Sequence, residues 1–298
     1  MAPLSEDPSE VFIINAALTG MVPTRADTPY VPLTVDEIAA DAAAVREAGA
    51  TVVHLHPRDD DGVPTTDRGR YAEVIAAVRE AVPDLLISAT CSGRLARTVD
   101  ERAVALTFTG DLRPDLGSLT CGSLNFPRQA SVNEPETIAE LARRMNDNGI
   151  KPEIEVFEPG MVNMARYLQR KGLLHEPLYV NILLGSLGTC PAGGCDLAWM
   201  VNSLPEGAIW SATGIGRYQL PVHGMALAMG GHVRVGLEDN TYYDWGSRTL
   251  ATNRQLVERV VRIGAELGRR PATPAEAREL IGLPAAVSRT DSPLMVYA

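Results

Sequence analysis

The feature that most constrains the fold of this chain is a repeated alternation of short aliphatic runs with longer amphipathic ones. Several of the eight short runs are apolar at nearly every position, which is typical of parallel strands buried on both faces. The expected strands are residues 11–17, 51–56, 85–90, 116–120, 154–157, 178–184, 209–213 and 233–236. Helical patterns lie between them, and the clearest cover residues 34–48, 67–82, 134–148 and 255–267.

This alternation predicts the fold class. A strand, a helix and a further strand call for right-handed crossovers and a parallel sheet. Eight such units in 298 residues match an α/β protein of the (β/α)8 TIM barrel type. An open doubly wound sheet is the alternative, but no GxGxxG motif opens the first helix. No linker divides the chain, so we expect a single domain over residues 1–298, with 284–298 as an irregular C-terminal tail.

Composition and charge exclude several classes of function. The formal net charge is −10, whereas a general nucleic-acid binder needs a concentrated basic surface. A local group of arginines could still hold a small anionic ligand. The acidic N-terminus has no apolar run, and no stretch of eighteen apolar residues occurs, so we expect neither a signal peptide nor a membrane span. The four cysteines form no CxxC pair and are expected to be reduced, as in a cytoplasmic enzyme.

The most specific chemical motif lies at the end of the second expected strand, where residues 51–59 have the sequence TVVHLHPRD. Side chains two residues apart on a strand point to the same face, so His54 and His56 can converge on one ion. They lie at the C-terminal end of the strand, where barrel enzymes place their active sites. Two imidazoles suit zinc, and a carboxylate as third ligand would leave a position open for catalysis. The competing interpretation is that one histidine is a hydrogen-bonded core residue.

A second motif follows the eighth expected strand, where residues 230–240 have the sequence GGHVRVGLEDN. Glu238 and Asp239 would emerge on the same face as the histidines, and Glu238 is the expected third metal ligand. Asp239 then remains for general-base work. Arg234 can set the charge state of Asp239 or pair with a substrate anion. The alternative is an exposed acidic turn that caps the next helix.

Two loops have the composition of anion-binding segments. Residues 87–94 (ISATCSGR) end the third strand, and Thr90, Ser92 and backbone N–H groups could bind a carboxylate while Arg94 adds positive charge. This pattern is weak, because loops rich in serine and glycine are common. Residues 184–189 (LGSLGT) follow the sixth strand and either admit a phosphate or an adenine nucleotide or merely turn the chain.

Together, these motifs resemble the beta-keto acid cleavage enzyme family, from about Ile13 to Leu283. The segments that carry the resemblance are 15–20 (NAALTG), 25–27 (RAD), 53–56 (VHLH), 123–126 (SLNF), 153–156 (EIEV), 160–161 (GM), 214–217 (GIGR) and 231–240 (GHVRVGLEDN). The resemblance implies a (β/α)8 barrel with a divalent metal, usually Zn2+, and a homotetramer. It also implies an acyltransferase that converts a β-keto acid and acetyl-CoA into acetoacetate and a new acyl-CoA.

The resemblance further implies a role for particular residues. The family's metal ligands, its base and the partner arginine of that base fall on His54, His56, Glu238, Asp239 and Arg234. The hydroxyl that supports the reacting group falls on Thr90, where a serine is common in relatives. Ser118 aligns with another polar position near the substrate. No cysteine nucleophile is needed for this chemistry.

Substrate choice depends on two positions. Relatives that accept a cationic, amino-substituted keto acid carry a glutamate shortly after the Thr-Gly pair, and the aligned residue here is Val22. Val22 offers no counter-charge, while Arg94 adds a cation near the third-strand loop. The sequence therefore predicts a neutral or anionic β-keto acid.

Two other classes of protein compete with this prediction. A metal-dependent hydrolase of the amidohydrolase type also uses an HxH motif on a barrel strand, but it needs further histidines from the middle strands. The remaining histidines, His175, His223 and His232, do not end the fifth or sixth expected strand. A non-enzymatic ligand-binding barrel would require the HxH and Glu-Asp motifs to be relics.

Overall fold

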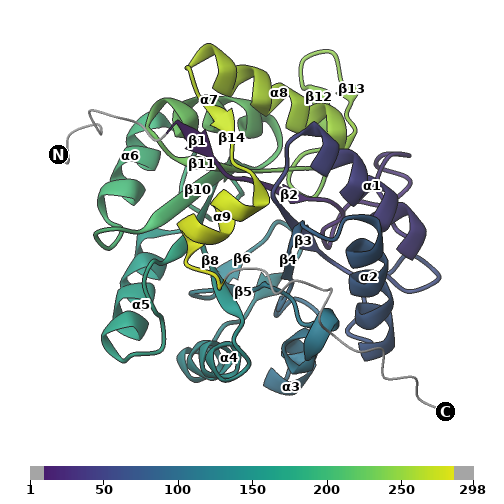
Figure 1. Ribbon diagram of the computed structural model, residues 1–298. Coiled ribbons are helices and arrows are strands. Elements are labelled where there is room, and N and C mark those ends of the chain that lie inside the picture. Colours follow the sequence, from purple (N-terminus) through teal and green to yellow (C-terminus); the bar gives the residue numbers. More distant parts are fainter. Residues whose placement is uncertain (1–9, 285–298) are drawn as a thin grey trace.

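The computed structural model describes residues 10–284, and its central feature is a closed barrel of eight parallel strands (Figure 1). The barrel strands follow one another in chain order: β2 (Ile14–Ala17), β3 (Val52–Leu55), β4 (Leu86–Ala89), β5 (Leu116–Thr120), β8 (Lys151–Val156), β9 (Tyr179–Leu184), β10 (Ile209–Gly214) and β11 (His232–Val235). Strand β11 pairs with β2 and closes the sheet. The predicted (β/α)8 barrel is therefore confirmed, and the open doubly wound sheet is wrong.

Two strands differ from their expected bounds for identifiable reasons. The first expected strand, 11–17, is divided: β1 (Val11–Phe12) pairs with β14 (Arg270–Pro271) outside the barrel, and only β2 enters it. The fifth strand, expected at 154–157, begins three residues earlier because β8 carries Glu153 and Glu155 on its inward face. Two acids in alternate positions interrupt the apolar run from which the strand was predicted.

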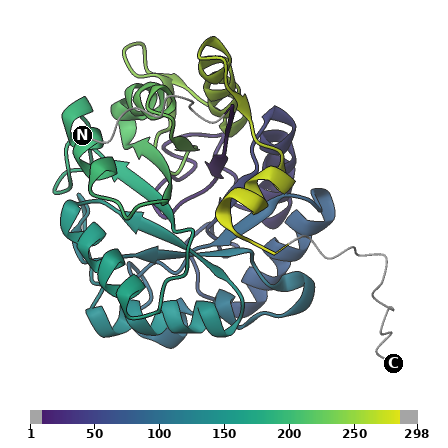
Figure 2. The same cartoon turned by 60° about the vertical axis from the view of Figure 1, so that its left-hand side comes forward.

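Helices surround the barrel as an outer ring (Figure 2). The four helices with clear amphipathic patterns form close to their expected bounds, as α1 (Val35–Ala48), α2 (Arg68–Ala81), α4 (Pro135–Asp147) and α8 (Asn253–Glu266). Thr34 and Glu37 form a capping box at the start of α1, and Gly49 ends the helix in the left-handed conformation. The remaining helices are α3 (Val99–Arg102), α5 (Pro159–Arg170), α6 (Gly194–Asn202), α7 (Gln219–Ala228) and α9 (Pro274–Ile281).

Short elements extend the loops at the C-terminal ends of the strands. Two of them are hairpins, β6 (Leu124–Asn125) with β7 (Ala130–Ser131) and β12 (Tyr242–Asp244) with β13 (Thr249–Leu250). The 3₁₀ turns are η1 (Val104–Thr107), η2 (Gly110–Leu112) and η3 (Gly216–Tyr218).

The opposite end of the barrel is closed by α9, which crosses it in Figure 1. Apolar residues at the N-terminal ends of the strands, including Ile13, Val52 and Leu116, form a cluster with Ala277 and Ile281 of this helix. Burial of this apolar surface fixes α9 across the N-terminal ends of the strands. Access to the barrel interior is thereby left to the C-terminal ends.

Some predictions concern the chain as a whole. The predicted irregular tail, 284–298, falls from residue 285 onward outside the described residues. No helix within residues 10–284 is long and apolar enough to cross a membrane. The four cysteines are unpaired, and Cys195 is the exposed one.

Candidate metal centre and active site

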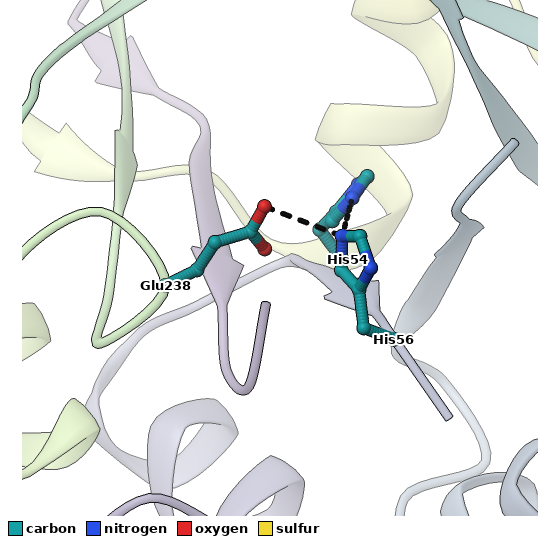
Figure 3. A group of neighbouring side chains, drawn as sticks. All are labelled: His54, His56 and Glu238. Atoms are coloured by element: carbon teal, nitrogen blue, oxygen red, sulfur yellow. Dashed lines mark hydrogen bonds and ion pairs between the residues drawn. The ribbon is translucent and has the colours of Figure 1, made fainter. Parts of the chain in front are cut away.

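The two histidines of the HxH motif meet Glu238 at the C-terminal end of the barrel (Figure 3). His54 lies on β3 and His56 directly after it; their side chains are 1% and 4% exposed, and their Nε2 atoms are 3.0 Å apart. Glu238 follows β11, and its Oε1 is 3.2 Å from His56 Nε2. One potential ligand atom from each of the three side chains lies within 4.8 Å of the others.

Two glycines allow Glu238 to reach this position. Gly236 has a φ of 153°, and a Cβ there would lie 2.1 Å from the carbonyl oxygen of Ala17. Gly20 has a φ of 67°, and a Cβ there would lie 2.4 Å from Cγ of Glu238. The turn after β11 and the turn after β2 therefore pack together only because both lack a side chain.

The three side chains fit a divalent metal. Glu238 Oε2 is buried without a hydrogen-bond partner, and buried polar atoms of native proteins are normally paired. Burial lowers the pKa of His56 to about 4, so its ring is neutral, as a metal ligand must be. Two imidazoles and one carboxylate are a known donor set of catalytic zinc sites. Within residues 10–284 this is the one group of three such side chains.

Glu153 is the residue of this site that sequence reasoning missed. It is fully buried, and its Oε2 lies 3.1 Å from His54 Nδ1 and accepts a hydrogen bond from Ser88 Oγ. Its Oε1 accepts from Asn15 Nδ2 at 2.6 Å and from Asn181 Nδ2. Burial opposes ionisation of Glu153, but the neighbouring His54, together with Arg234 and Ser88, lowers its pKa to about 2.

This ionised carboxylate determines the orientation of a metal ligand. A carboxylate can only accept, so His54 carries its proton on Nδ1 and directs the Nε2 lone pair toward His56 and Glu238. Carboxylate partners of this kind orient metal-binding histidines in many proteins. The alternating acids at 153 and 155 in an otherwise apolar strand were the sequence signal that could have found Glu153.

Arg234 is the positive charge around which the buried carboxylates of the site are grouped. Its guanidinium is buried and lies 2.8 Å from Glu238 Oε1, 3.0 Å from Asp239 Oδ2 and 3.2 Å from Glu155 Oε1. Burial works against its charge, but Asp239, Glu238 and Glu155 raise its pKa well above the usual value. Four carboxylates, counting Glu153, thus face one guanidinium, and a bound dication would offset this excess of negative charge.

A cavity of about 620 Å³ adjoins these residues. The predicted site residues that line it are His54, His56, Thr90, Ser92, Arg94, Val22, Arg234, Glu238 and Asp239. Thr120 also lines it and donates to Glu155 at 2.7 Å, a contact that sequence reasoning did not anticipate. Burial raises the pKa of Asp239, and the neighbouring Glu238 adds to the effect against the opposing charge of Arg234.

Ser118 is not among the residues that line the cavity. Its Oγ accepts a hydrogen bond from the backbone N–H of Cys91 at 3.0 Å, behind the loop that carries Thr90 and Ser92. This contact holds the loop, and the expected position of Ser118 near the substrate stays a prediction. Ser118 was assigned by alignment alone, which does not reveal the direction of a side chain on its strand.

Arg94 and Val22 also line the cavity. The guanidinium carbon of Arg94 is 3.4 Å from the centre of the Phe126 ring, and no carboxylate within residues 10–284 forms an ion pair with it. Val22 is 54% exposed. An unpaired cation and an apolar residue therefore stand where a cationic substrate group would need an acid.

The other predicted features lie as follows. Ser186 of the 184–189 loop lines the cavity, and the loop turns at Gly185 and Gly188, both with positive φ. His223 contacts the backbone oxygen of Arg234 at 2.8 Å, and Nδ1 of His232 accepts from the backbone of Ile13. No further histidine of residues 10–284 joins the metal ligands. The site therefore lacks the additional histidines from the middle strands that an amidohydrolase site requires.

The fold and the site together define the class of protein, an enzyme of the (β/α)8 barrel type with a His-His-Glu group at the C-terminal ends of its strands. Residues 12–283 match the model of the beta-keto acid cleavage enzyme family. The chain belongs to this family, and the predicted resemblance is confirmed.

Several named relatives cover nearly the whole chain. A 3-keto-5-aminohexanoate cleavage enzyme of Fusobacterium nucleatum is 42% identical over 92% of this chain and 98% of its own length. A 3-oxoadipate:acetyl-CoA acetyltransferase of Cupriavidus necator is 40% identical over 91% of this chain and 95% of its own. The solved structure of ObcA, in a ternary complex with a C4-CoA adduct and oxalate, is similar with a TM-score of 0.77. It is 22% identical, covers 86% of this chain and 68% of its own, and shows the likeness of fold.

Proposed function

We propose that this protein transfers an acyl group between a β-keto acid and acetyl-CoA, giving acetoacetate and a new acyl-CoA, with zinc held by His54, His56 and Glu238. The observation that carries the proposal is the position of Asp239, held by Arg234 beside the three potential ligands and facing the same cavity. The relative from Cupriavidus necator, named as an acetyl-CoA acetyltransferase, supports acetyl-CoA as the second substrate.

The first step would be removal of a proton from C2 of the keto acid. A divalent ion in the site would act as a Lewis acid on the keto oxygen and make this proton more acidic. Arg234 Nε donates to Asp239 Oδ2, which orients the carboxylate and leaves Oδ1 to take the proton. The raised pKa of buried Asp239 makes it a stronger base than an exposed aspartate.

The remaining steps form one carbon–carbon bond and break another. The C2 carbanion attacks the carbonyl carbon of the acetyl thioester, a carbon–carbon bond forms, and CoA leaves as a thiolate. The thiolate then attacks the original keto carbon, and the bond between this carbon and C2 breaks. The acyl group departs as acyl-CoA, and Asp239 returns its proton to C2 of acetoacetate. The Thr90 hydroxyl, which lines the cavity, is proposed to support the reacting group.

We further propose that the substrate is neutral or anionic. Arg94 supplies an unpaired positive charge on the cavity wall, Ser92 lies on the same loop, and Val22 offers no negative charge. The relative named for 3-oxoadipate, a keto acid with two carboxylates, agrees with this preference. The relative named for an aminated keto acid is 42% identical, slightly more than the 40% of the oxoadipate relative, so the two cavity positions rather than total identity support the choice.

The test is a direct assay of the purified, zinc-loaded protein. Acetyl-CoA is combined with neutral, anionic and aminated β-keto acids, and acetoacetate and acyl-CoA are measured. We expect both products in equal amounts, with the highest kcat/KM for a neutral or anionic substrate. Absence of acetoacetate with every substrate contradicts the proposal. The single domain and the cytoplasmic location expected from the sequence and the homotetramer implied by the resemblance remain part of the proposal, and sedimentation analysis measures the oligomeric state.

A further inference from the structure

The catalytic segment runs directly into the β12–β13 hairpin. Three residues after Asp239, the chain enters this hairpin, and Asn240 fixes its base: Nδ2 donates to the Tyr242 carbonyl at 2.6 Å and Oδ1 accepts from its N–H at 3.1 Å. Tyr242 and Trp245 line the same cavity as Glu238. One continuous space therefore extends from the metal ligands to an aromatic pair on the hairpin.

A cationic side chain lies against these two aromatic rings. Trp245 is 38% exposed, and its ring meets Tyr242 edge to face at 5.0 Å. The guanidinium of Arg248 lies 4.3 Å from the centre of the Trp245 ring and 5.1 Å from that of Tyr242. Arg248 has a φ of 58° and is the one non-glycine residue with positive φ in the described part of the chain. This uncommon conformation places its side chain against the two rings.

A second cation comes from the neighbouring turn η3. Gly216 donates its N–H to the backbone oxygen of Asp239 at 2.8 Å, and a Cβ on Gly216 would lie 3.5 Å from the Trp245 ring. The turn is thus attached both to the catalytic segment and to the indole. The next residue, Arg217, is exposed and lies against Tyr218. Neither Arg217 nor Arg248 has an ion pair within residues 10–284, although the whole chain carries a net charge of −10.

We propose that this surface, Tyr242, Trp245, Arg248 and Arg217, binds the nucleotide portion of acetyl-CoA; the inference rests on the proposed function. Adenine would stack on the exposed indole, and the two arginines would pair with the phosphates. Trp245 follows Glu238 by seven residues, which limits their separation to about 25 Å. An extended pantetheine arm spans such a gap and carries the thioester to the metal ligands.

Two other parts of the cavity wall fit the nucleotide less well. The 184–189 loop contains no arginine or lysine to pair with phosphates, although its glycines would admit a nucleotide. The β6–β7 hairpin contributes Arg128 to the cavity, but without an aromatic ring stacked on it. The nearby Phe126 ring lies against Arg94, to which the keto acid is assigned.

The experiment compares two thioesters that differ only in the nucleotide end. Acetyl-CoA and acetyl-N-acetylcysteamine, which lacks the nucleotide and most of the arm, are assayed with wild type, Trp245→Ala and Arg248→Ala. We expect each variant to raise KM for acetyl-CoA about tenfold with kcat little changed. Stacking and phosphate contacts stabilise the bound substrate and the transition state equally, so their loss weakens binding without slowing the chemical step. For acetyl-N-acetylcysteamine we expect wild type and variants to have the same kinetic constants. Trp245→Phe, which keeps a ring, should restore most of the affinity.

Two control variants test whether the hairpin, rather than another part of the surface, holds the nucleotide. Trp199→Ala removes an exposed tryptophan on α6, outside the cavity lining, and should leave both KM values unchanged. A larger effect of Arg128→Ala than of Arg248→Ala, or equal losses with both thioesters, overturns the assignment to the hairpin. If wild type makes acetoacetate but the hairpin variants bind CoA normally by calorimetry, the inference fails and the proposed function stands. If wild type neither binds CoA nor makes acetoacetate, both fail.

Discussion

Glu153 controls the metal site without touching the cavity. Glu153→Gln replaces one accepting oxygen with an NH2 group, which is expected to rotate or retautomerise His54. Loss of such a partner lowers metal affinity by about 10- to 100-fold. Zinc affinity measured by competition with a chelator tests this expectation. Glu155→Gln is the matched control, because Glu155 contacts Arg234 rather than a histidine; equal affinities of wild type and Glu153→Gln would contradict the prediction.

Val22 determines the charge of the substrate in our proposal. Val22→Glu adds a partly exposed acid to the cavity wall, and it should improve kcat/KM for an aminated β-keto acid by about fivefold, the range of an exposed ion pair. Rates with aminated and anionic substrates are compared. Val22→Gln has nearly the same shape without the charge and should show no such gain. An equal gain in both variants would mean that size rather than charge matters at this position.

Residue-level patterns revealed the part of the site that depends on local spacing. His54 and His56 follow from the period of a strand, and the Glu238–Asp239 pair follows from its position after the eighth strand. Glu153 could not be assigned in this way, because its four hydrogen-bond partners come from four different barrel strands. Ser118 shows the complementary limit, since an aligned position does not specify which group its hydroxyl contacts.

The turn after β11 depends on one glycine. Gly236→Ala would place a methyl group against the Ala17 carbonyl oxygen, so the turn must move and Glu238 with it. We expect a loss of stability well above 1 kcal/mol and a reduced zinc content, measured by denaturation and elemental analysis. Gly207→Ala is the matched control: Gly207 also has positive φ but no atom within 4 Å, so it should cost only about 1 kcal/mol and keep the metal. Full zinc occupancy in Gly236→Ala would refute this account.

The contact between α1 and α8 makes stability depend on pH. Burial raises the pKa of Asp41 to about 6, although Asn253 Nδ2 donates to it at 2.6 Å. Between the usual value near 4 and this raised value, the folded state binds more protons than the unfolded one, so this contribution falls as pH rises.

Asp41→Asn removes this titration. Its free energy of unfolding relative to wild type should increase by about 1 kcal/mol from pH 5 to pH 8, discounted for the partial exposure of Asp41. Urea denaturation at both pH values gives this difference. Asp36→Asn, on an exposed position of the same helix, serves as the control. A difference between Asp41→Asn and wild type that is constant with pH would show that Asp41 does not titrate in this range.

Helices with a clear hydrophobic period were predictable from the sequence, and helices without one were not. α1, α2, α4 and α8 have apolar stripes that face the barrel. α7 was not predicted because it is largely apolar, with buried residues such as Val222 and Leu227. α6 has only nine residues and begins after glycine. α7 packs against strands β10 and β11, and α6 packs against β9 and α7, so their positions depend on tertiary contacts rather than on a local pattern.

At the scale of the whole molecule, the excess of buried carboxylates should couple metal binding to stability. In our proposal zinc binds the folded chain, so saturating zinc should stabilise it by about 3 to 4 kcal/mol at 100 to 1,000 times the dissociation constant. Thermal unfolding with zinc and with a chelator measures the difference. His56→Ala should show almost no response to zinc, whereas His175→Ala, an exposed histidine elsewhere, should respond as wild type does. A Tm independent of zinc in wild type would contradict a metal at this site.

The barrel itself was predictable from the number and order of the strands. Its closure at one end was not, because α9 and β14 join the two ends of the described chain through contacts about 260 residues apart, such as that between Val11 and Arg270. No local pattern contains such a pairing.

The helix α9, which closes the N-terminal end of the barrel, also limits the route by which substrates and products enter and leave. Both substrates and both products must use the opening at the C-terminal ends of the strands. In our proposal the keto acid lies beside His54, His56 and Glu238 and acetyl-CoA extends outward to the hairpin, so the keto acid would enter first. Acyl-CoA would likewise depart before acetoacetate, and we therefore expect an ordered kinetic mechanism.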